Sequence, residues 1–495
     1  MEQHIPGIVL KDGLTQPVFD YKRCLFEKVY VETPVDTDGD GRLDLIAVYI
    51  RRPLETTQGM RVPAIYVANP YMLECNEDWY VPHDVDRDVS PYPQQHITES
   101  DITFDPSTVS FPQPRYPRAT VGYADTAPTE EIPLDCISDW YSYFNSRGYA
   151  SVFCGGLGTR GSQGFNCCGS PEETAAFKAV IDWLNGRCRA FTNLTDNIEI
   201  RADWCTGKVA MSGKSYLGTM CIAVASTGVE GLETIIPEAA ISNWYDYYRC
   251  NGLNLPAIGW QGDDLDILAK YCFSRAKDPE DYASVREAYA AWLEGIAADE
   301  DRDSGNYSRW WDMRNYLKAA DRFKASVFLV HGLADWNVKP THCVNLFAAM
   351  ECRGIPCKMM LHQGGHIYIH DLQGSRFNEM LHLWLDHWLY GIENGAAERI
   401  PNVLVQSNLD QDLWLASPSF PAVKGYTEPV LMPAQESGRL VDDLSATVYD
   451  RTRDNAAEWL AELVLSERHA HCLRYITAPL KTDTRISGTV QVSFR

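Results

Sequence analysis

The sequence lacks any long apolar run and any excess of basic residues. None of its 495 residues lies in a stretch approaching the roughly 18 apolar positions that a membrane-spanning helix needs, and residues 1–10 show no basic segment followed by an apolar one. Lys and Arg number 44 against 67 Asp and Glu, so the net charge is −23 and the field repels phosphates and anionic lipids. We therefore expect no membrane partner and no nucleic acid partner.

The cysteines also lack an organising pattern. There are 15, an odd number, and no C-x-x-C pair occurs, which disfavours a disulfide framework and a zinc ribbon. This usage is typical of reduced thiols and predicts a cytoplasmic protein. The hydrophobic fraction of 45% and charged fraction of 22% are those of a globular chain with a sizeable core.

Hydrophobic periodicity predicts an α/β fold. Residues 22–70 alternate as strands do, and later strand patterns at 149–154, 208–212, 326–330 and 357–361 are separated by helical stretches such as 171–185. Strands that alternate with helices indicate a doubly wound parallel sheet covered on both faces.

Composition changes divide the chain into four predicted segments. Residues 1–243 and 323–395 form the α/β core, and a helix-rich insertion at 244–322 forms a cap over one end of the sheet. A β-rich domain follows at 400–495. Its last residues, 489–495, alternate as a strand does, so we expect this domain to be incomplete.

A serine stands between an apolar strand and an apolar helix. Ser215 follows the strand pattern at 208–212, and Gly213 and Gly218 permit a tight turn that exposes its hydroxyl beside the N–H groups of the helix start. The second glycine comes one position later than in G-x-S-x-G. The pattern favours a nucleophile elbow, and an ordinary strand-to-helix turn is the alternative.

A nucleophilic serine needs a histidine base and an acid that orients it, and both follow in the order serine, acid, histidine. Asp335 follows the strand pattern at 326–330, and His366 follows the one at 357–361. Doubly wound sheets place their sites at such strand ends. Asp321 and Asp312 are the alternative acids, although neither immediately follows a predicted strand.

Three other motifs are weaker. Residues 156–161 match G-x-G-x-x-G, but the next helix begins about ten residues later than a dinucleotide fold requires. His362, His366 and His370 are spaced as zinc ligands on a helix would be, but Gly364 and Gly365 oppose a helix. Residues 36–41 begin like an EF-hand loop but lack the glutamate at its twelfth position, which favours a hairpin turn.

With these residues in place, the sequence over about residues 25–495 resembles the Xaa-Pro dipeptidyl-peptidase family of serine peptidases, which are related to α/β-hydrolases of the cocaine esterase type. The resemblance rests on residues 36–44, 69–71, 158–162, 213–218, 241–248 and 335–338. It implies an α/β-hydrolase core with a helical cap and a C-terminal β-sandwich of jelly-roll type. The family's jelly roll runs beyond the point where this chain ends, and the helical N-terminal domain of some members has no counterpart here.

The resemblance implies a set of catalytic residues. Ser215 is the nucleophile, Asp335 the orienting acid and His366 the base. The oxyanion would be held by the backbone N–H of Tyr216 and the hydroxyl of Tyr71. No metal and no organic cofactor is implied.

It also implies how a peptide with proline at its second position is recognised. Trp244 and Tyr247 match the aromatic residues of the proline pocket, since a flat pyrrolidine ring packs well on aromatic faces. Asn337 and Asp263 match the groups that pair with the substrate ammonium, with Asp263 in place of the family's glutamate and Asp264 as its neighbour. A homodimer remains open.

The sequence thus predicts a serine exopeptidase that releases N-terminal Xaa-Pro dipeptides through an acyl-enzyme. The nearest alternative is an ester or amide acyl hydrolase of the cocaine esterase type, which would share the triad and differ in the cap. A non-catalytic binding protein on a hydrolase scaffold is a further alternative, and a zinc hydrolase that uses the three histidines is another.

Overall fold

A computed structural model describes residues 5–85, 96–130, 139–255, 260–372, 374–422 and 479–483. Most of the β domain expected at 400–495 therefore lies outside the described residues. Among those described, no helix is long and apolar enough to cross a bilayer.

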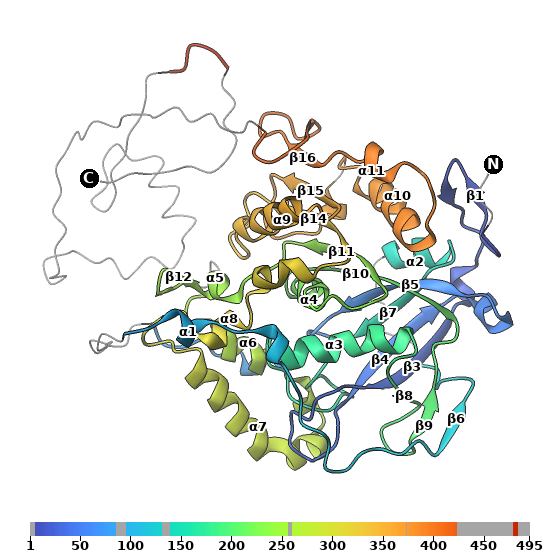
Figure 1. Cartoon of the computed structure of the whole chain (residues 1–495), viewed down its shortest axis with the longest axis vertical. Coiled ribbons are helices and arrows are strands. Elements are labelled where there is room, and N and C mark those ends of the chain that lie inside the picture. Colours follow the sequence, from blue (N-terminus) through green and yellow to red (C-terminus); the bar gives the residue numbers. More distant parts are fainter. Residues whose placement is uncertain are drawn as a thin grey trace, which may run out of the picture.

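A 13-stranded sheet runs through the molecule (Figure 1). Its strands, in spatial order, are β17 (Trp414–Ser417), β16 (Val403–Gln406), β15 (Cys357–His362), β14 (Ser326–Gly332), β11 (Leu232–Glu238), β10 (Cys205–Lys214), β5 (Val62–Ala68), β7 (Ala150–Cys154), β4 (Leu45–Arg52), β3 (Leu25–Glu32), β8 (Ala190–Phe191), β9 (Ile198–Ile200) and β6 (Gly122–Ala124). The seven adjacent strands from β16 to β7 are parallel to one another. The strands of the opening segment, β3 and β4, pair antiparallel with each other, and β4 pairs antiparallel with β7.

Two strands that follow residue 400 belong to the central sheet. Val403–Gln406 pairs parallel with β15, and β17 pairs antiparallel with β16, so both extend the central sheet. Their apolar residues face the same core as the other strands, because Val403 is fully buried.

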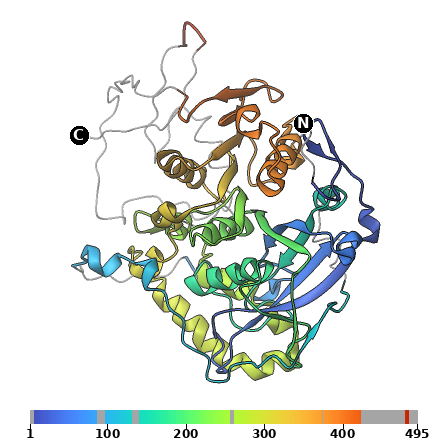
Figure 2. The ribbon, with the colours of Figure 1, turned by 45° about the vertical axis from the view of Figure 1, so that its right-hand side comes forward.

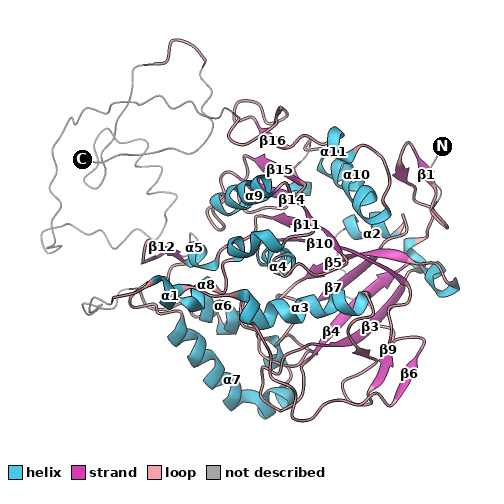
Figure 3. Cartoon of the chain, viewed as in Figure 1, coloured by secondary structure: helices cyan, strands magenta, loops and turns pink. Residues whose placement is uncertain are grey.

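Helices cover both faces of the sheet (Figure 3). The α-helices in the described residues are α1 (Glu99–Ile102), α2 (Asp139–Asn145), α3 (Pro171–Leu184), α4 (Tyr216–Ala225), α5 (Trp244–Tyr248), α6 (Leu265–Cys272), α7 (Pro279–Asp299), α8 (Arg309–Asp312), α9 (Thr341–Arg353), α10 (Phe377–Tyr390) and α11 (Ala396–Arg399). Residues of α3, α4 and α9 share one apolar cluster with the strands, whereas residues of α2, α10 and α11 share another. Successive strand residues belong to different clusters, as with Ile65 and Tyr66, because side chains alternate across a strand.

Two small hairpins accompany the main sheet. β1 (Leu10–Lys11) and β2 (Leu14–Thr15) form one of them, which lies beside α10 in both views of the ribbon (Figures 1 and 2). Thr15 donates from both its N–H and its hydroxyl to the Asp386 carboxylate of α10, at 2.8 and 2.9 Å. The other hairpin, β12 (Arg249–Cys250) with β13 (Leu253–Asn254), belongs to the cap.

The insertion between β11 and β14, which we refer to as the cap, is largely helical. It contains α5 to α8 and a 3-10 helix, η7 (Tyr316–Arg322), and α7 runs along its outer edge in both views (Figures 1 and 2). Asp278 caps α7 through the N–H groups of Glu280 and Asp281, and Pro279 occupies the first turn. Because β11 and β14 are parallel neighbours, the insertion leaves the sheet at the carboxyl end of β11 and rejoins it at the opposite edge, at the amino end of β14.

Candidate active site

Ser215 occupies a strained turn between β10 and α4. Its backbone has φ 63° and ψ −128°, a conformation that costs a non-glycine residue on the order of 1–3 kcal/mol. The Ser215 N–H donates to the Glu238 carbonyl at 2.8 Å, and its carbonyl accepts from the Thr219 N–H at 2.8 Å. Both backbone contacts hold the turn in place.

The spacing of the two glycines follows from close packing at this turn. A Cβ on Gly218 would lie 2.6 Å from the Gly213 carbonyl oxygen and 2.9 Å from Ala240 Cβ. A Cβ on Gly213 would lie 2.4 Å from Leu217 Cβ. Side chains at either position would push the helix off the strand, so the glycine one position beyond the usual motif has a steric role here.

Asp335 and His366 meet at the carboxyl edge of the sheet. Asp335 follows β14 and His366 follows β15, and these strands are parallel neighbours. His366 Nδ1 lies 2.8 Å from Asp335 Oδ2. Asp335 Oδ1 accepts from the backbone N–H groups of Asn337 and Val338, both at 2.9 Å. The buried carboxylate is therefore oriented by its own loop before it contacts the imidazole.

The hydroxyl of Ser215 forms no hydrogen bond with His366 among the described contacts. The nearest link between their segments is Lys214, whose Nζ donates to the His366 carbonyl at 3.4 Å. Hydrogen bonds of catalytic groups are commonly long in the absence of substrate and tighten when it binds. Asp335 and His366 are thus in direct contact, and Lys214, the residue before Ser215, contacts the loop of His366.

The alternative acids lie in other surroundings. Asp312 accepts from the Phe104 N–H at 2.7 Å and from the Tyr307 hydroxyl, and it forms an ion pair with Lys318. Asp321 is exposed within η7. Neither contacts His366 in the described part of the chain.

Two donors suited to an oxyanion flank the serine. Tyr216 is the first residue of α4, so its N–H has no acceptor within the helix. Tyr71 follows β5, the neighbour of β10, and its ring meets the Tyr216 ring edge-on at 5.8 Å. Burial raises the pKa of the Tyr71 hydroxyl well above its ordinary value, so this group stays protonated and can donate.

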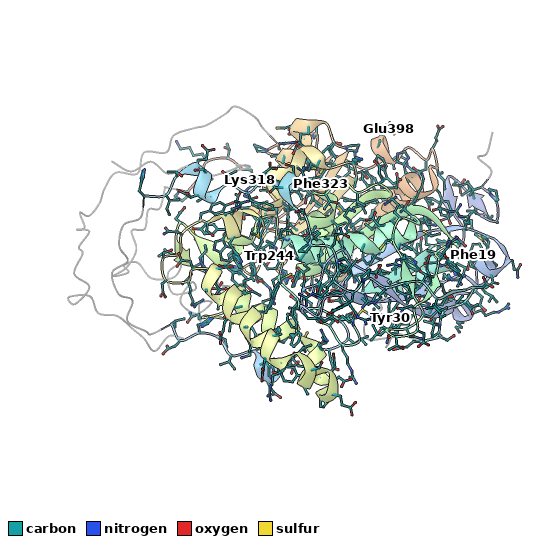
Figure 4. The ribbon with its side chains drawn as sticks, turned by 60° about the horizontal axis from the view of Figure 1, so that its bottom comes forward. Phe19, Tyr30, Trp244, Lys318, Phe323 and Glu398 are labelled. Atoms are coloured by element: carbon teal, nitrogen blue, oxygen red, sulfur yellow. The ribbon has the colours of Figure 1, made fainter. Side chains whose placement is uncertain are left out.

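The aromatic residues of α5 pack around the same point. Trp244, the first residue of α5 in the cap, is fully buried, and its ring meets the Tyr216 ring edge-on at 5.1 Å; Figure 4 labels its position. The Tyr247 hydroxyl donates to Asn337 Oδ1 at 2.7 Å. Since Asn337 also donates its N–H to Asp335, this bond joins the cap to the loop of the acid.

The neighbours Asp263 and Asp264 differ in their partners. Asp264 is fully buried and accepts from Arg249 at 2.9 Å and from Arg302 at 2.6 Å. Asp263 is also buried, but its Oδ1 has no hydrogen-bond partner among the described residues. Burial, followed by repulsion from Asp264, raises the pKa of Asp263 to about 7. Asp263 is therefore the carboxyl that retains an acceptor for a cation.

Two buried tyrosine hydroxyls adjoin Asp263. Those of Tyr248 and Tyr80 lie close enough to lower its pKa, and each lacks a hydrogen-bond partner within the described ranges. Buried polar atoms without partners are rare in folded proteins. Asp263 and these two hydroxyls therefore form a buried polar cluster.

Sequence reasoning missed the role of two buried glutamates. The Glu173 carboxylate accepts from the Gly169 N–H at the start of α3. It also accepts from the Tyr216 hydroxyl, which lies 2.8 Å from Oε1 and 3.0 Å from Oε2. Glu238 ends β11 directly beside the elbow. Burial raises the pKa of each to about 7. The only available signal for Glu238 was an acidic residue at the end of an apolar strand.

The three histidines considered as zinc ligands have separate partners. His362 Nδ1 accepts from the Gly364 N–H at 3.1 Å, and His370 stacks on Tyr368 at 4.9 Å. Within the described ranges, two other groups have ligand atoms within 4.8 Å of one another: His83, Asp266 and Glu300, and Asp36, Asp38 and Asp40. Their atoms are already engaged, since His83 Nε2 lies 3.0 Å from both Asp266 oxygens and Arg275 pairs with Asp38 at 2.8 Å.

Comparison with known proteins identifies related sequences over nearly the whole chain. Residues 38–368 match the family model described as X-Pro dipeptidyl-peptidase (S15 family), and residues 394–495 match the X-Pro dipeptidyl-peptidase C-terminal non-catalytic domain. Every residue placed above around Ser215 falls within the first match.

Curated relatives carry the name Xaa-Pro dipeptidyl-peptidase. The protein of Pediococcus pentosaceus is 40% identical over 504 residues, covering 97% of this chain and 62% of the relative. That of Lacticaseibacillus rhamnosus is 43% identical over 489 residues, covering 97% and 60%. The chain thus spans about three fifths of the length of these relatives. A solved CocE/NonD family hydrolase from Staphylococcus aureus is similar at a TM-score of 0.47 and 14% identity, covering 82% of this chain and 63% of that one.

Proposed function

The chain belongs to the X-Pro dipeptidyl-peptidase (S15) family, and on this basis we propose that it is a serine exopeptidase that releases N-terminal Xaa-Pro dipeptides from peptides. The observation that carries the proposal is the 2.8 Å contact between His366 and the preoriented Asp335, at the sheet edge that also holds the strained Ser215.

The proposed reaction proceeds through an acyl-enzyme. Ser215 Oγ attacks the carbonyl carbon of the proline residue while His366 Nε2 takes the hydroxyl proton. Asp335 stabilises the imidazolium and keeps its Nδ1–H in place, through the contact at 2.8 Å. The Tyr216 N–H and the Tyr71 hydroxyl stabilise the oxyanion. His366 then protonates the leaving amine, and a water that it deprotonates releases the dipeptide.

The proposed specificity comes from the cap. Trp244 and Tyr247 provide aromatic walls for a proline ring, which offers no N–H of its own. Asp263 and Asn337 receive the substrate ammonium, since Asp263 Oδ1 has no partner among the described residues and Asn337 Oδ1 retains a lone pair beyond its bond with Tyr247. A cation beside Asp263 lowers its pKa and favours its ionised form.

We also propose a cytoplasmic location. The 13 cysteines among the described residues are all free, and most are buried, which fits a reducing compartment.

Comparison of two substrate classes tests the activity. We expect the protein to hydrolyse Ala-Pro p-nitroanilide, and Ser215→Ala to lose this activity while the wild type is labelled at Ser215 by a fluorophosphonate. Activity confined to simple aryl esters would instead support an acyl hydrolase of the cocaine esterase type. A folded protein that resists labelling would support a binding role, and loss of activity on chelation would support a zinc hydrolase.

A further inference from the structure

Glu238 contacts the nucleophile turn through its backbone. It ends β11, where its residue position pairs with Lys214 of β10. Its carbonyl accepts the Ser215 N–H at 2.8 Å. The position of Glu238 is therefore fixed relative to the serine.

The side chain of Glu238 reaches the loop that carries the base. Its Oε2 accepts from the Ile369 N–H at 2.9 Å, and this contact is buried. Ile369 begins the 3-10 helix η8 (Ile369–Asp371), three residues after His366. One residue thus holds the serine through its backbone and the histidine loop through its carboxylate.

Lys214 adds a second attachment for the same loop. Its Nζ lies 3.4 Å from the His366 carbonyl oxygen and 4.8 Å from the centre of the Tyr368 ring. The stretch from His366 to Ile369 is therefore held at both ends, by Lys214 and by Glu238. These attachments come from neighbouring strands whose ends also position Ser215.

The charge of Glu238 changes near neutral pH. Burial raises its pKa to about 7, against the lowering effect of the Ile369 N–H and of Lys214, and Asp371 raises it further. Burial, and to a smaller extent the charge of Glu238, raises the pKa of the Tyr141 and Tyr368 hydroxyls. An ionised Glu238 is the stronger acceptor for a backbone N–H, because charge-assisted hydrogen bonds exceed neutral ones in strength.

The distance between base and nucleophile is open to adjustment. The described contacts include no Ser215–His366 hydrogen bond, and His366 follows two glycines, Gly364 and Gly365. A misplacement of about 1 Å between reacting groups can reduce a rate on the order of a hundredfold.

We propose that Glu238 is a positioning residue that, with Lys214, holds the loop of His366 at the distance from Ser215 that proton transfer requires. The inference rests on the proposed function and deepens it. It assigns to ionised Glu238 a contribution to kcat that is separate from substrate binding.

Replacement of Glu238 by its neutral isostere tests the proposal. Glu238→Gln should leave KM for Ala-Pro p-nitroanilide unchanged and lower kcat at pH 8.5 on the order of tenfold, as expected for loss of one charge-assisted bond. Below pH 7 the wild-type carboxyl is itself neutral, so the ratio of wild-type to variant kcat should approach one. The matched control is Glu233→Gln, at the other end of β11, which should behave as the wild type.

The pH dependence separates positioning from a purely structural role. A ratio that stays constant with pH, or full kcat in Glu238→Gln at pH 8.5, would overturn the proposal. Thermal unfolding at pH 8.5 provides a second readout, because removing a buried charge should leave the melting temperature unchanged or raise it. If kcat and stability fall together at every pH, the residue is structural only.

Lys214→Met provides a second, independent variant. Lys214 lowers the pKa of Glu238, so removing the lysine charge should raise that pKa. The fall of kcat at acidic pH should then begin at a higher pH than in the wild type, and an unchanged pH profile would contradict the proposal. The rate of Ser215 labelling by a fluorophosphonate should show the same wild-type to Glu238→Gln ratio. If labelling shows this ratio but the dipeptide amide is not hydrolysed, the proposed function fails while the role of Glu238 stands.

Discussion

Replacing Asp335 with asparagine should prevent His366 from acting as a base, without disturbing the fold. Asp335 Oδ1 accepts two backbone N–H groups at 2.9 Å, so the amide oxygen of Asn takes this position and the amide nitrogen faces His366 Nδ1 at about the 2.8 Å now observed. His366 Nδ1 must then accept, and its proton moves to Nε2. An imidazole protonated at Nε2 cannot take the proton of Ser215.

The geometry sets the size of this effect. Turning the amide to restore the His366 contact would place its NH₂ against two buried N–H donors, at a cost of at least about 2 kcal/mol, so only about 3% of molecules would be competent. We therefore expect kcat to fall at least about 30-fold and up to about 10⁴-fold, the size typical of this change in a catalytic triad.

The assay is kcat for Ala-Pro p-nitroanilide at pH 8, with folding checked by thermal unfolding. Asp321→Asn, the exposed alternative acid, is the matched control and should retain wild-type activity. If Asp335→Asn keeps more than a tenth of the wild-type kcat, Asp335 does not set the tautomer of His366 and the assignment of the acid is wrong.

Three other substitutions have distinct expected outcomes. Asp263→Asn should raise KM for the dipeptide amide roughly 10- to 100-fold, and because the pKa of Asp263 is raised to about 7, wild-type KM should itself rise as pH falls below 7 while the variant's stays flat. Ser215→Gly should abolish activity yet increase the free energy of unfolding by up to about 1 kcal/mol, because glycine accepts φ 63° without strain. Glu173→Gln should be more stable than the wild type at pH 8 by about 3 kcal/mol in thermal unfolding, and equal to it below about pH 4.5.

The sign of the Glu173 prediction follows from its raised pKa. The unfolded carboxyl titrates near 4.5 and the folded one near 7, so the folded state binds more protons between these values and loses stability as pH rises through them. A glutamine removes this loss. A wild-type stability that increases between pH 5 and 7 relative to the variant would contradict the placement of Glu173 in a desolvated site.

Asp263→Asn and Ser215→Gly each have a result that would contradict the prediction made for them. An N-acetylated substrate lacks the ammonium, so Asp263→Asn should leave its KM unaltered, and a rise there would argue against ammonium binding. A lower melting temperature for Ser215→Gly than for Ser215→Ala would argue against strain at the turn.

Several features of the site could be read from local sequence. Ser215 lies at the junction of an apolar strand and an apolar helix, and Asp335 and His366 each follow a strand pattern, so short-range periodicity was enough to propose them. The helix at 171–185 could also be predicted from local sequence, because Ser170 is a favoured N-cap residue and Pro171 a favoured first-turn residue. The resemblance to a family then supplied Asp263, but not a choice between Asp263 and Asp264.

Other features depend on contacts between distant segments. Arg249 and Arg302 neutralise Asp264 and leave Asp263 available, and neither pairing is visible in local spacing. Glu173 accepts from the hydroxyl of Tyr216, 43 residues away, and local spacing gives no sign of this contact. β16 joined the central sheet although its segment resembles the β-rich region that follows, because strand pairing depends on the neighbouring edge.

The sequence by itself determined where strands end, where helices begin and which reactive side chains stand at those junctions, because backbone preference and apolar periodicity act over a few residues. Only the tertiary structure decided which junctions are neighbours, which carboxyls are paired and which are buried without a partner. The strand order that brings Glu238 to Ile369, 131 residues apart, arises from packing of the whole core, and burial of that contact sets the charge state on which we expect catalysis to depend.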